Sequence, residues 1–239
     1  MNPDLEHDED DDGIRLPPFN SAKAVRGVFA HRQGEQPVDE RRVADFWENQ
    51  GFGVEFLEPN PRELRSLLPD LRLTRDGQLF AYCEVKTIWR HTSHIRILHE
   101  GRLVEERVDV SKAGVEERLT TDVIASIRQL LYANPDHGLL NIVVLVNRDA
   151  DANAALLAHV LNRRPSYKEI ASQDWRAAKS IEEVEKFRLG VDICLWGDSS
   201  AGDGFSVSNY FLLNPRLAEE VKTWTGLDEE KRIMLQSAA

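Results

Sequence analysis

The chain has 239 residues, and its hydrophobic content of 41% is sufficient for the core of one domain with embellishments. Its two cysteines, Cys83 and Cys194, are too few for a cysteine-rich zinc site, and both lie in apolar runs where we expect buried thiols. No segment has the length of a membrane span, and the acidic N-terminus lacks a secretory signal pattern. We therefore expect a cytoplasmic protein with no membrane partner.

The net charge of −11 is concentrated at the N-terminus. Residues 1–12 hold seven acids and no lysine or arginine, which leaves −4 for the rest of the chain. The total charge argues against a general nonspecific coat of nucleic acid, but the mildly acidic body is compatible with local basic surfaces. We expect residues 1–17 to form a disordered solubilising tail, because so few apolar side chains cannot offset the entropy of ordering. A mimic of nucleic-acid phosphate is the alternative.

A helix is expected from residue 38, with Asp39 as its N-cap and Gly51 as its stop. Its apolar stripe consists of Val43, Ala44, Phe46 and Trp47. Glu40 falls on the same face as this stripe, where an acid is unusual. Either the helix dipole favours an acid in the first turn, or the carboxylate reaches toward a sheet.

After a strand at residues 53–57, the stretch 68–86 predicts two strands joined by a tight turn at Asp76-Gly77. Asp70 begins the first strand, whereas Glu84 and Lys86 share one face of the second. A two-residue turn would put Asp70 on the opposite face. A three-residue loop would pair it with residue 82, on the face of Glu84, and a bulge or bend would also restore that face.

Residues 87–117 predict a second hairpin inserted into the domain, with strands at 95–98 and 102–104. This stretch is rich in arginine and histidine, and Arg90 and Arg96 are candidates for contacts with phosphate. We expect its histidines to be solvated rather than bound to zinc, because they lack further ligands at a suitable spacing.

The rest of the chain alternates helices and strands. A helix over residues 118–133 precedes the apolar run 140–146, which suits a central strand reached by a crossover connection in a mixed sheet. Residues 149–153 resemble a calcium loop, but the expected glycine and closing acid are absent, so they are interpreted as a helix N-cap. Further elements are expected as a helix to residue 162, a helix at 175–187, strands at 191–196 and 205–213, and a C-terminal helix from Pro215.

Two acids and a lysine on one hairpin suit the hydrolysis of phosphodiester bonds. Mg²⁺ prefers oxygen ligands, and Asp70, Glu84 and the carbonyl of Val85 could supply them; Mn²⁺ is also suitable. Lys86 could orient or deprotonate the attacking water, or stabilise the charge that develops on phosphorus. Glu40 could hold a metal-bound water or a second cation.

Pro69-Asp70, followed after thirteen residues by Glu84-Val85-Lys86, resembles the motif of the PD-(D/E)xK nuclease superfamily. The order of helix, three strands, long helix and buried strand over residues 38–147 also resembles the core of that family. The resemblance implies an α/β fold of the restriction-endonuclease-like kind, in which a mixed central sheet is flanked by helices. It also implies a Mg²⁺-dependent nuclease, with DNA as the expected substrate.

On this basis the nuclease-like domain spans residues 18–215, with its core at 38–147 and the inserted hairpin arm at 88–117. Residues 216–239 are a C-terminal helical extension. Gln129 and Tyr132 resemble a Gln and Tyr pair of RecB-like members, although they are spaced one residue closer. Gln129 and Arg128 are therefore candidates for contacts near the site, and a solvent-facing pair is the alternative.

Two other interpretations remain open. The chain could be a catalytically silent member of the same fold that binds nucleic acid or a protein, or the hairpin could be purely structural, with Asp70, Glu84 and Lys86 in a surface salt bridge. The sequence also leaves open a homodimer.

Overall fold

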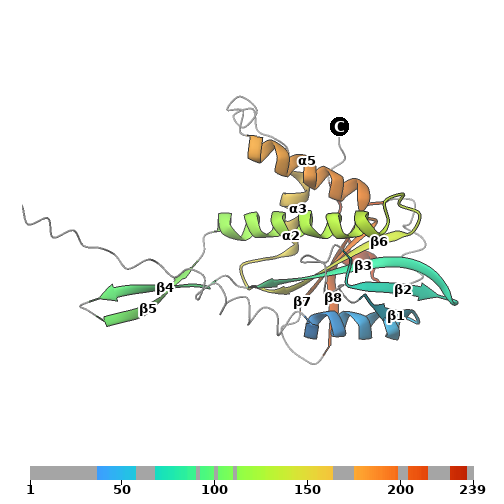
Figure 1. The fold of residues 1–239 in the computed structure, drawn as a ribbon, viewed down its shortest axis with the longest axis horizontal. Helices are drawn as coiled ribbons and strands as arrows, with labels where there is room; N and C mark the ends of the chain where they lie inside the picture. Colours follow the sequence, from blue (N-terminus) through green and yellow to red (C-terminus); the bar gives the residue numbers. More distant parts are fainter. Residues whose placement is uncertain are drawn as a thin grey trace, which may run out of the picture. The chain divides into compact units, whose positions relative to one another are not determined.

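The structure, a computed structural model, describes the chain in eight segments (Figure 1). They are residues 37–57, 68–89, 92–99, 102–109, 112–163, 175–198, 204–214 and 227–235. The predictions for the acidic tail, for Arg90 and for the C-terminal helix from Pro215 lie outside these segments.

A six-stranded mixed sheet, in the order β1-β2-β3-β6-β7-β8, forms the centre of the described chain. Its strands are β1 (Gly53–Phe56), β2 (Leu71–Arg75), β3 (Gln78–Trp89), β6 (Leu140–Arg148), β7 (Ile193–Asp198) and β8 (Ser206–Leu212). β6 runs parallel to both of its neighbours, β3 and β7. The pairs β1–β2, β2–β3 and β7–β8 are antiparallel. The predicted mixed sheet, with the apolar run of β6 at its centre, is therefore confirmed.

The helices divide between the two faces of this sheet. They are α2 (Lys112–Ala133), α3 (Ala154–Asn162), α5 (Trp175–Gly190), a 3-10 turn η2 (Glu229–Lys231) and a helix over residues 37–49. α2 and α5 pack against each other, and α3 contacts both (Figure 1). No helix in the described segments is long and apolar enough to cross a membrane.

Each face of the sheet has its own buried core. One core joins the helix at 37–49 to Cys83, Val85 and alternate residues of the neighbouring strands. The other joins α2, α3 and α5 to Ile88, Cys194 and the intervening residues of the same strands. Because side chains alternate along a strand, consecutive residues of β3 belong to different cores, which decides where its polar residues lie. Both cysteines are buried free thiols, as expected.

The long helix and the N-cap were predicted correctly in their essentials. α2 starts six residues before the predicted position, and Val123, Ile127 and Leu130 of its predicted apolar face are fully buried. At the start of α3 the side chain of Asn153 accepts a hydrogen bond from the backbone N–H of Leu156, so the predicted N-cap is confirmed.

The prediction for Asp39 is wrong. Residues 37–49 are helical, so Asp39 lies inside the first turn instead of at the N-cap, and its side chain is fully buried. The helix does end as predicted, because Gly51 adopts a left-handed φ of 85° that favours glycine, and its N–H donates to the carbonyl of Glu48.

The inserted hairpin is confirmed, with longer strands than predicted. β4 (Thr92–His99) and β5 (Arg102–Asp109) form a separate antiparallel two-stranded sheet, in which His99 pairs with Arg102. Arg96 pairs with Glu105 along the backbone.

Candidate active site

Of the alternatives that the sequence left open for the β2–β3 hairpin, the structure has the two-residue turn and not the three-residue loop. Arg75 pairs with Gln78, and the turn residues Asp76 and Gly77 both have positive φ angles, 52° and 76°, as a tight hairpin turn of this kind requires. Such a turn alone would place Asp70 on the wrong face of the sheet.

A β-bulge corrects the register. Thr74 pairs with Leu79 but Leu73 pairs with Ala81, so Phe80 is an extra residue in β3. Beyond this point Leu71 pairs with Cys83, which brings Asp70 opposite Glu84. The bulge is thus the feature that places the two acids of the predicted motif side by side.

The pairing of β2 with β3 ends just before the motif acids. Asp70 Oδ2 accepts a hydrogen bond from the backbone N–H of Val85 at 2.7 Å. This side-chain bond replaces the backbone bond that a longer β2 would have made to Val85. The N–H and C=O of one strand residue point to the same side, so the Val85 carbonyl faces the same gap as Asp70. Two carboxylates and a backbone carbonyl therefore surround one position at the edge of β3.

Lys86 is held between β3 and α2. Its amine forms an ion pair with Glu84 Oε1 and donates to Gln129 Oε1 at 2.9 Å. The side-chain amide of Gln129 in turn donates to the carbonyl of Leu68 at 3.0 Å. Gln129 thus fixes both the lysine and the segment that leads into Asp70, so it is not a solvent-facing residue.

Burial and mutual repulsion govern the charges of this group. Glu84 is fully buried, and burial followed by the charge of Asp70 raises the pKa of its carboxyl well above 4.5. Burial also raises the pKa of Asp70, although Lys86 partly opposes it. For Lys86, burial lowers the pKa, but Glu84 and Asp70 outweigh it and the net pKa is raised. The two acids therefore favour the charged form of the Lys86 amine.

A divalent cation fits this arrangement. Glu84 Oε2 is buried and accepts no hydrogen bond from any described residue, so one carboxylate oxygen beside Asp70 lacks a positive partner. No group of three His, Cys, Asp or Glu side chains within the described segments could hold a metal. A cation here would have the two carboxylates, the Val85 carbonyl and water as ligands, a set that suits Mg²⁺ or Mn²⁺.

The salt bridge of the purely structural interpretation is present in part, but it is not on the surface. The side chains of Lys86 and Glu84 are only 16% and 0% exposed. A buried ion pair has to overcome the loss of hydration of both groups, and this one leaves a second carboxylate, Asp70, beside it. Folding stability alone gives no physical reason for this arrangement.

The other predicted site residues are distributed elsewhere. Glu40 belongs to the helix at 37–49, which packs on the face of the sheet opposite to α2, Glu84 and Lys86. Arg128 is exposed and forms an ion pair with Glu183 of α5 at 3.1 Å. For Arg96, only the backbone pairing is described.

The sequence did not indicate the contacts of Asp39, a fully buried acid near this end of the sheet. Asp39 accepts from Arg148 Nε and Nη2, at 2.8 and 2.5 Å, and from the Thr87 hydroxyl at 2.8 Å. An acid in the first turn of an apolar helix and an arginine at the end of a buried strand were the available signals. Nothing in the sequence showed that the two residues meet.

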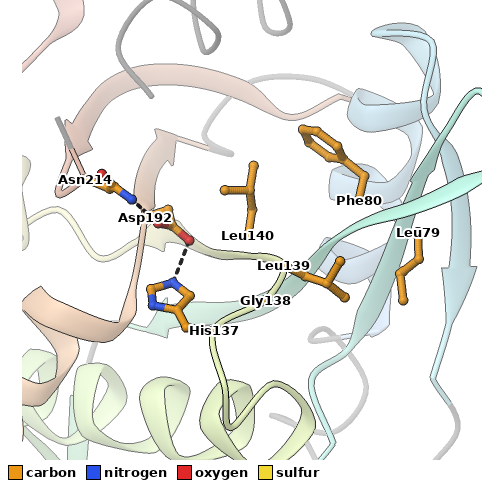
Figure 2. A pocket seen from close by; sticks show the side chains of 8 residues that line it. All are labelled: Leu79, Phe80, His137, Gly138, Leu139, Leu140, Asp192 and Asn214. Carbon is orange, nitrogen blue, oxygen red and sulfur yellow. Dashed lines mark hydrogen bonds and ion pairs between the residues drawn. The ribbon is translucent and has the colours of Figure 1, made fainter. Parts of the chain in front are cut away.

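A separate cleft of about 340 Å³ lies where β3 and β6 begin. Figure 2 shows the side chains of His137 and Asn214 directed at the carboxylate of Asp192, which is buried. Asp192 Oδ2 also accepts from the backbone N–H of Asn141 at 2.8 Å, and Oδ1 accepts from Asn214 at 2.9 Å. Since its donors come from three segments, the carboxylate joins the starts of β6 and β7 to the end of β8.

Replacement of Asp192 by alanine is expected to destabilise the fold by about 2–4 kcal/mol, because it leaves a buried backbone N–H and two side chains without their acceptor. Urea unfolding followed by circular dichroism measures the change. Asp136→Ala, at an exposed position of the neighbouring turn, is the control and is expected to change stability by less than about 0.5 kcal/mol. Equal effects of the two substitutions would contradict a structural role for the Asp192 carboxylate.

Comparison of the chain with protein-family models, curated proteins and solved structures finds no match.

Proposed function

We propose that this chain is a metal-dependent nuclease that hydrolyses phosphodiester bonds, with DNA as its substrate. The observation that carries the proposal is the convergence of Asp70, Glu84 and Lys86 at the point where β2 leaves β3. This convergence depends on the bulge, on the hydrogen bond to Val85 and on the buried position of Glu84. Folding stability does not require the three charged groups to meet there.

The residues divide into distinct roles. Asp70, Glu84 and the Val85 carbonyl would hold Mg²⁺ or Mn²⁺, and the bound metal would supply Lewis-acid stabilisation and an acidified water. The Lys86 ammonium, which forms an ion pair with Glu84, would stabilise negative charge on the phosphoryl oxygens. Gln129 is a positioning residue, because it fixes the direction of the lysine amine.

The arrangement of elements supports the same proposal. A helix, three strands, the long helix α2 and the buried parallel strand β6 follow one another as in the restriction-endonuclease-like fold, and we assign the chain to the PD-(D/E)xK superfamily on this order and on the motif. The order of helices and strands is by itself only an analogy with that fold, so the proposal depends mainly on the geometry of the site.

The direct test is cleavage of plasmid and linear DNA, and of RNA, by the full chain with Mg²⁺ or Mn²⁺. Asp70→Asn retains an oxygen that can accept from the Val85 N–H, so the fold is expected to persist while cleavage falls by about 10²-fold or more. Excess EDTA is expected to have the same effect on the wild type.

Asp76→Asn is the matched control, since it makes the same substitution in the exposed turn of the same hairpin. It is expected to leave cleavage within about twofold of wild type. Cleavage that persists in Asp70→Asn would refute the site. Metal-independent binding of nucleic acid without cleavage would instead identify a catalytically silent member of the fold.

A further inference from the structure

Three arginines from three different elements gather around the C-terminal end of β3. Arg42 lies on the helix at 37–49, Arg118 on α2 and Arg148 at the end of β6. We call Arg42, Arg118 and Arg148 the arginine cluster. The C-terminal ends of parallel strands are the edge of an α/β sheet where ligands bind most often.

Trp89, the last residue of β3, lies between two members of this cluster. The Arg148 guanidinium lies over its indole ring, 5.0 Å from the centroid, and Arg118 Nη1 donates to its carbonyl. The indole is partly exposed. An arginine over an exposed aromatic ring is a combination that binds nucleic-acid backbone and bases in other settings.

Two buried acids hold the arginines in place. Asp39 binds Arg148 through two nitrogens, and Asp149 binds Arg118 at 3.0 Å. These two carboxylates therefore fix the positions of the guanidinium groups at this end of the sheet.

Arg42 is the member with the most hydrogen-bonding capacity to spare. Its contact with Asp39 is a single approach of 3.5 Å by Nη1, since Arg148 already occupies the carboxylate at shorter distances. A guanidinium carries five N–H donors, so several remain for a ligand. The side chain is 20% exposed and that of Arg148 is 21% exposed, so an anion can reach both.

The cluster lies at the same end of β3 as the candidate active site, since Trp89 follows Lys86 by three residues, about 10 Å along an extended strand. Arg118 lies on α2, on the same face of the sheet as Lys86, whereas Arg42 and Arg148 lie on the opposite face. We propose that the arginine cluster binds the phosphodiester backbone of a nucleic acid that runs past the C-terminal end of β3 from the bond held at Asp70 and Glu84, an inference that rests on the proposed nuclease function.

The test compares two neighbouring arginines of one helix. Arg41 is 58% exposed and forms ion pairs with Asp45 and Glu48, so Arg41→Gln removes the same charge outside the cluster. Both Arg42→Gln and Arg41→Gln are made in the full-length Asp70→Asn chain, so that the probe stays intact. Binding is measured by fluorescence anisotropy at several salt concentrations with Mg²⁺ present, using duplex DNA, single-stranded DNA and RNA of equal length.

Arg42→Gln is expected to weaken binding by about five- to tenfold near 0.1 M salt and to reduce the salt slope by about one. Arg41→Gln is expected to change the affinity by less than about twofold. The nucleic acid with the largest difference between the variants is the one that the cluster binds. Equal effects of the two substitutions on every probe would overturn the inference.

The two proposals fail separately in this design. Cleavage by the wild type together with unaltered binding by Arg42→Gln would overturn the arginine cluster and leave the nuclease site intact. Binding that depends on Arg42, in a wild-type chain that cleaves no substrate, would overturn the nuclease and retain the cluster as a nucleic-acid contact.

Discussion

Replacement of Lys86 by methionine is expected to lower the rate of phosphodiester cleavage by about 10²–10⁴-fold. The methionine keeps the length of the side chain but removes the ammonium that faces Glu84 and Gln129. The lost charge would have stabilised the phosphoryl oxygens, so the effect should appear in kcat more than in KM. Single-turnover cleavage at saturating enzyme measures this directly.

The control for this substitution is another lysine held by acids. Lys186 on α5 forms ion pairs with Glu182 and Glu183 but lies on the surface, and Lys186→Met is expected to leave the rate within about twofold. Gln129→Leu is expected to have an intermediate effect of about tenfold, because the lysine keeps its charge but loses one of the bonds that orient it. A Lys86→Met variant with more than about a tenth of the wild-type rate would exclude a catalytic role for the lysine.

Glu84→Gln is expected to raise folding stability by about 1 kcal/mol at neutral pH while it abolishes metal-dependent cleavage. Among the described residues, the buried Glu84 carboxylate faces Asp70 with one oxygen unbonded, and Lys86 offsets its charge. The amide removes the repulsion and can still accept a bond from the lysine. Thermal unfolding in EDTA measures the first effect, and the nuclease assay measures the second.

The gain in stability should depend on pH with a definite sign. The folded state holds the Glu84 proton more tightly than the unfolded chain does, because the folded-state pKa is raised above 4.5. Below that pH both states are protonated and the carboxyl costs nothing. As the pH rises toward the folded-state pKa, the wild type loses stability that Glu84→Gln retains. The difference in free energy of unfolding between the two proteins should therefore grow with pH.

Addition of Mg²⁺ or Mn²⁺ should make the wild type more stable than Glu84→Gln. A cation bound by the two carboxylates stabilises the folded wild type, whereas the glutamine variant binds it weakly and responds little. Glu182→Gln, an exposed glutamate of α5, is the control and is expected to show neither effect. A wild type whose unfolding temperature is insensitive to both cations, and equal to that of Glu84→Gln at all pH values, would contradict the site.

Local patterns in the sequence determined much of this fold. The apolar run of β6, the periodicity of α2 and the turn at Asp76-Gly77 depend on neighbours within a few positions, so they could be predicted directly. The motif residues Asp70, Glu84 and Lys86 were identified for the same reason: a strand of period two put the last two on one face.

Tertiary structure decided how these pieces meet. The turn alone would have separated Asp70 from Glu84, and the bulge at Phe80 reunited them, a change of one residue that no turn signal encodes. Gln129 and Asp39 acquire their roles only because α2 and the helix at 37–49 pack on opposite faces of β3, where contacts join residues more than forty positions apart. Sequence spacing determines which residues share an element, whereas packing between elements determines which side chains share a site.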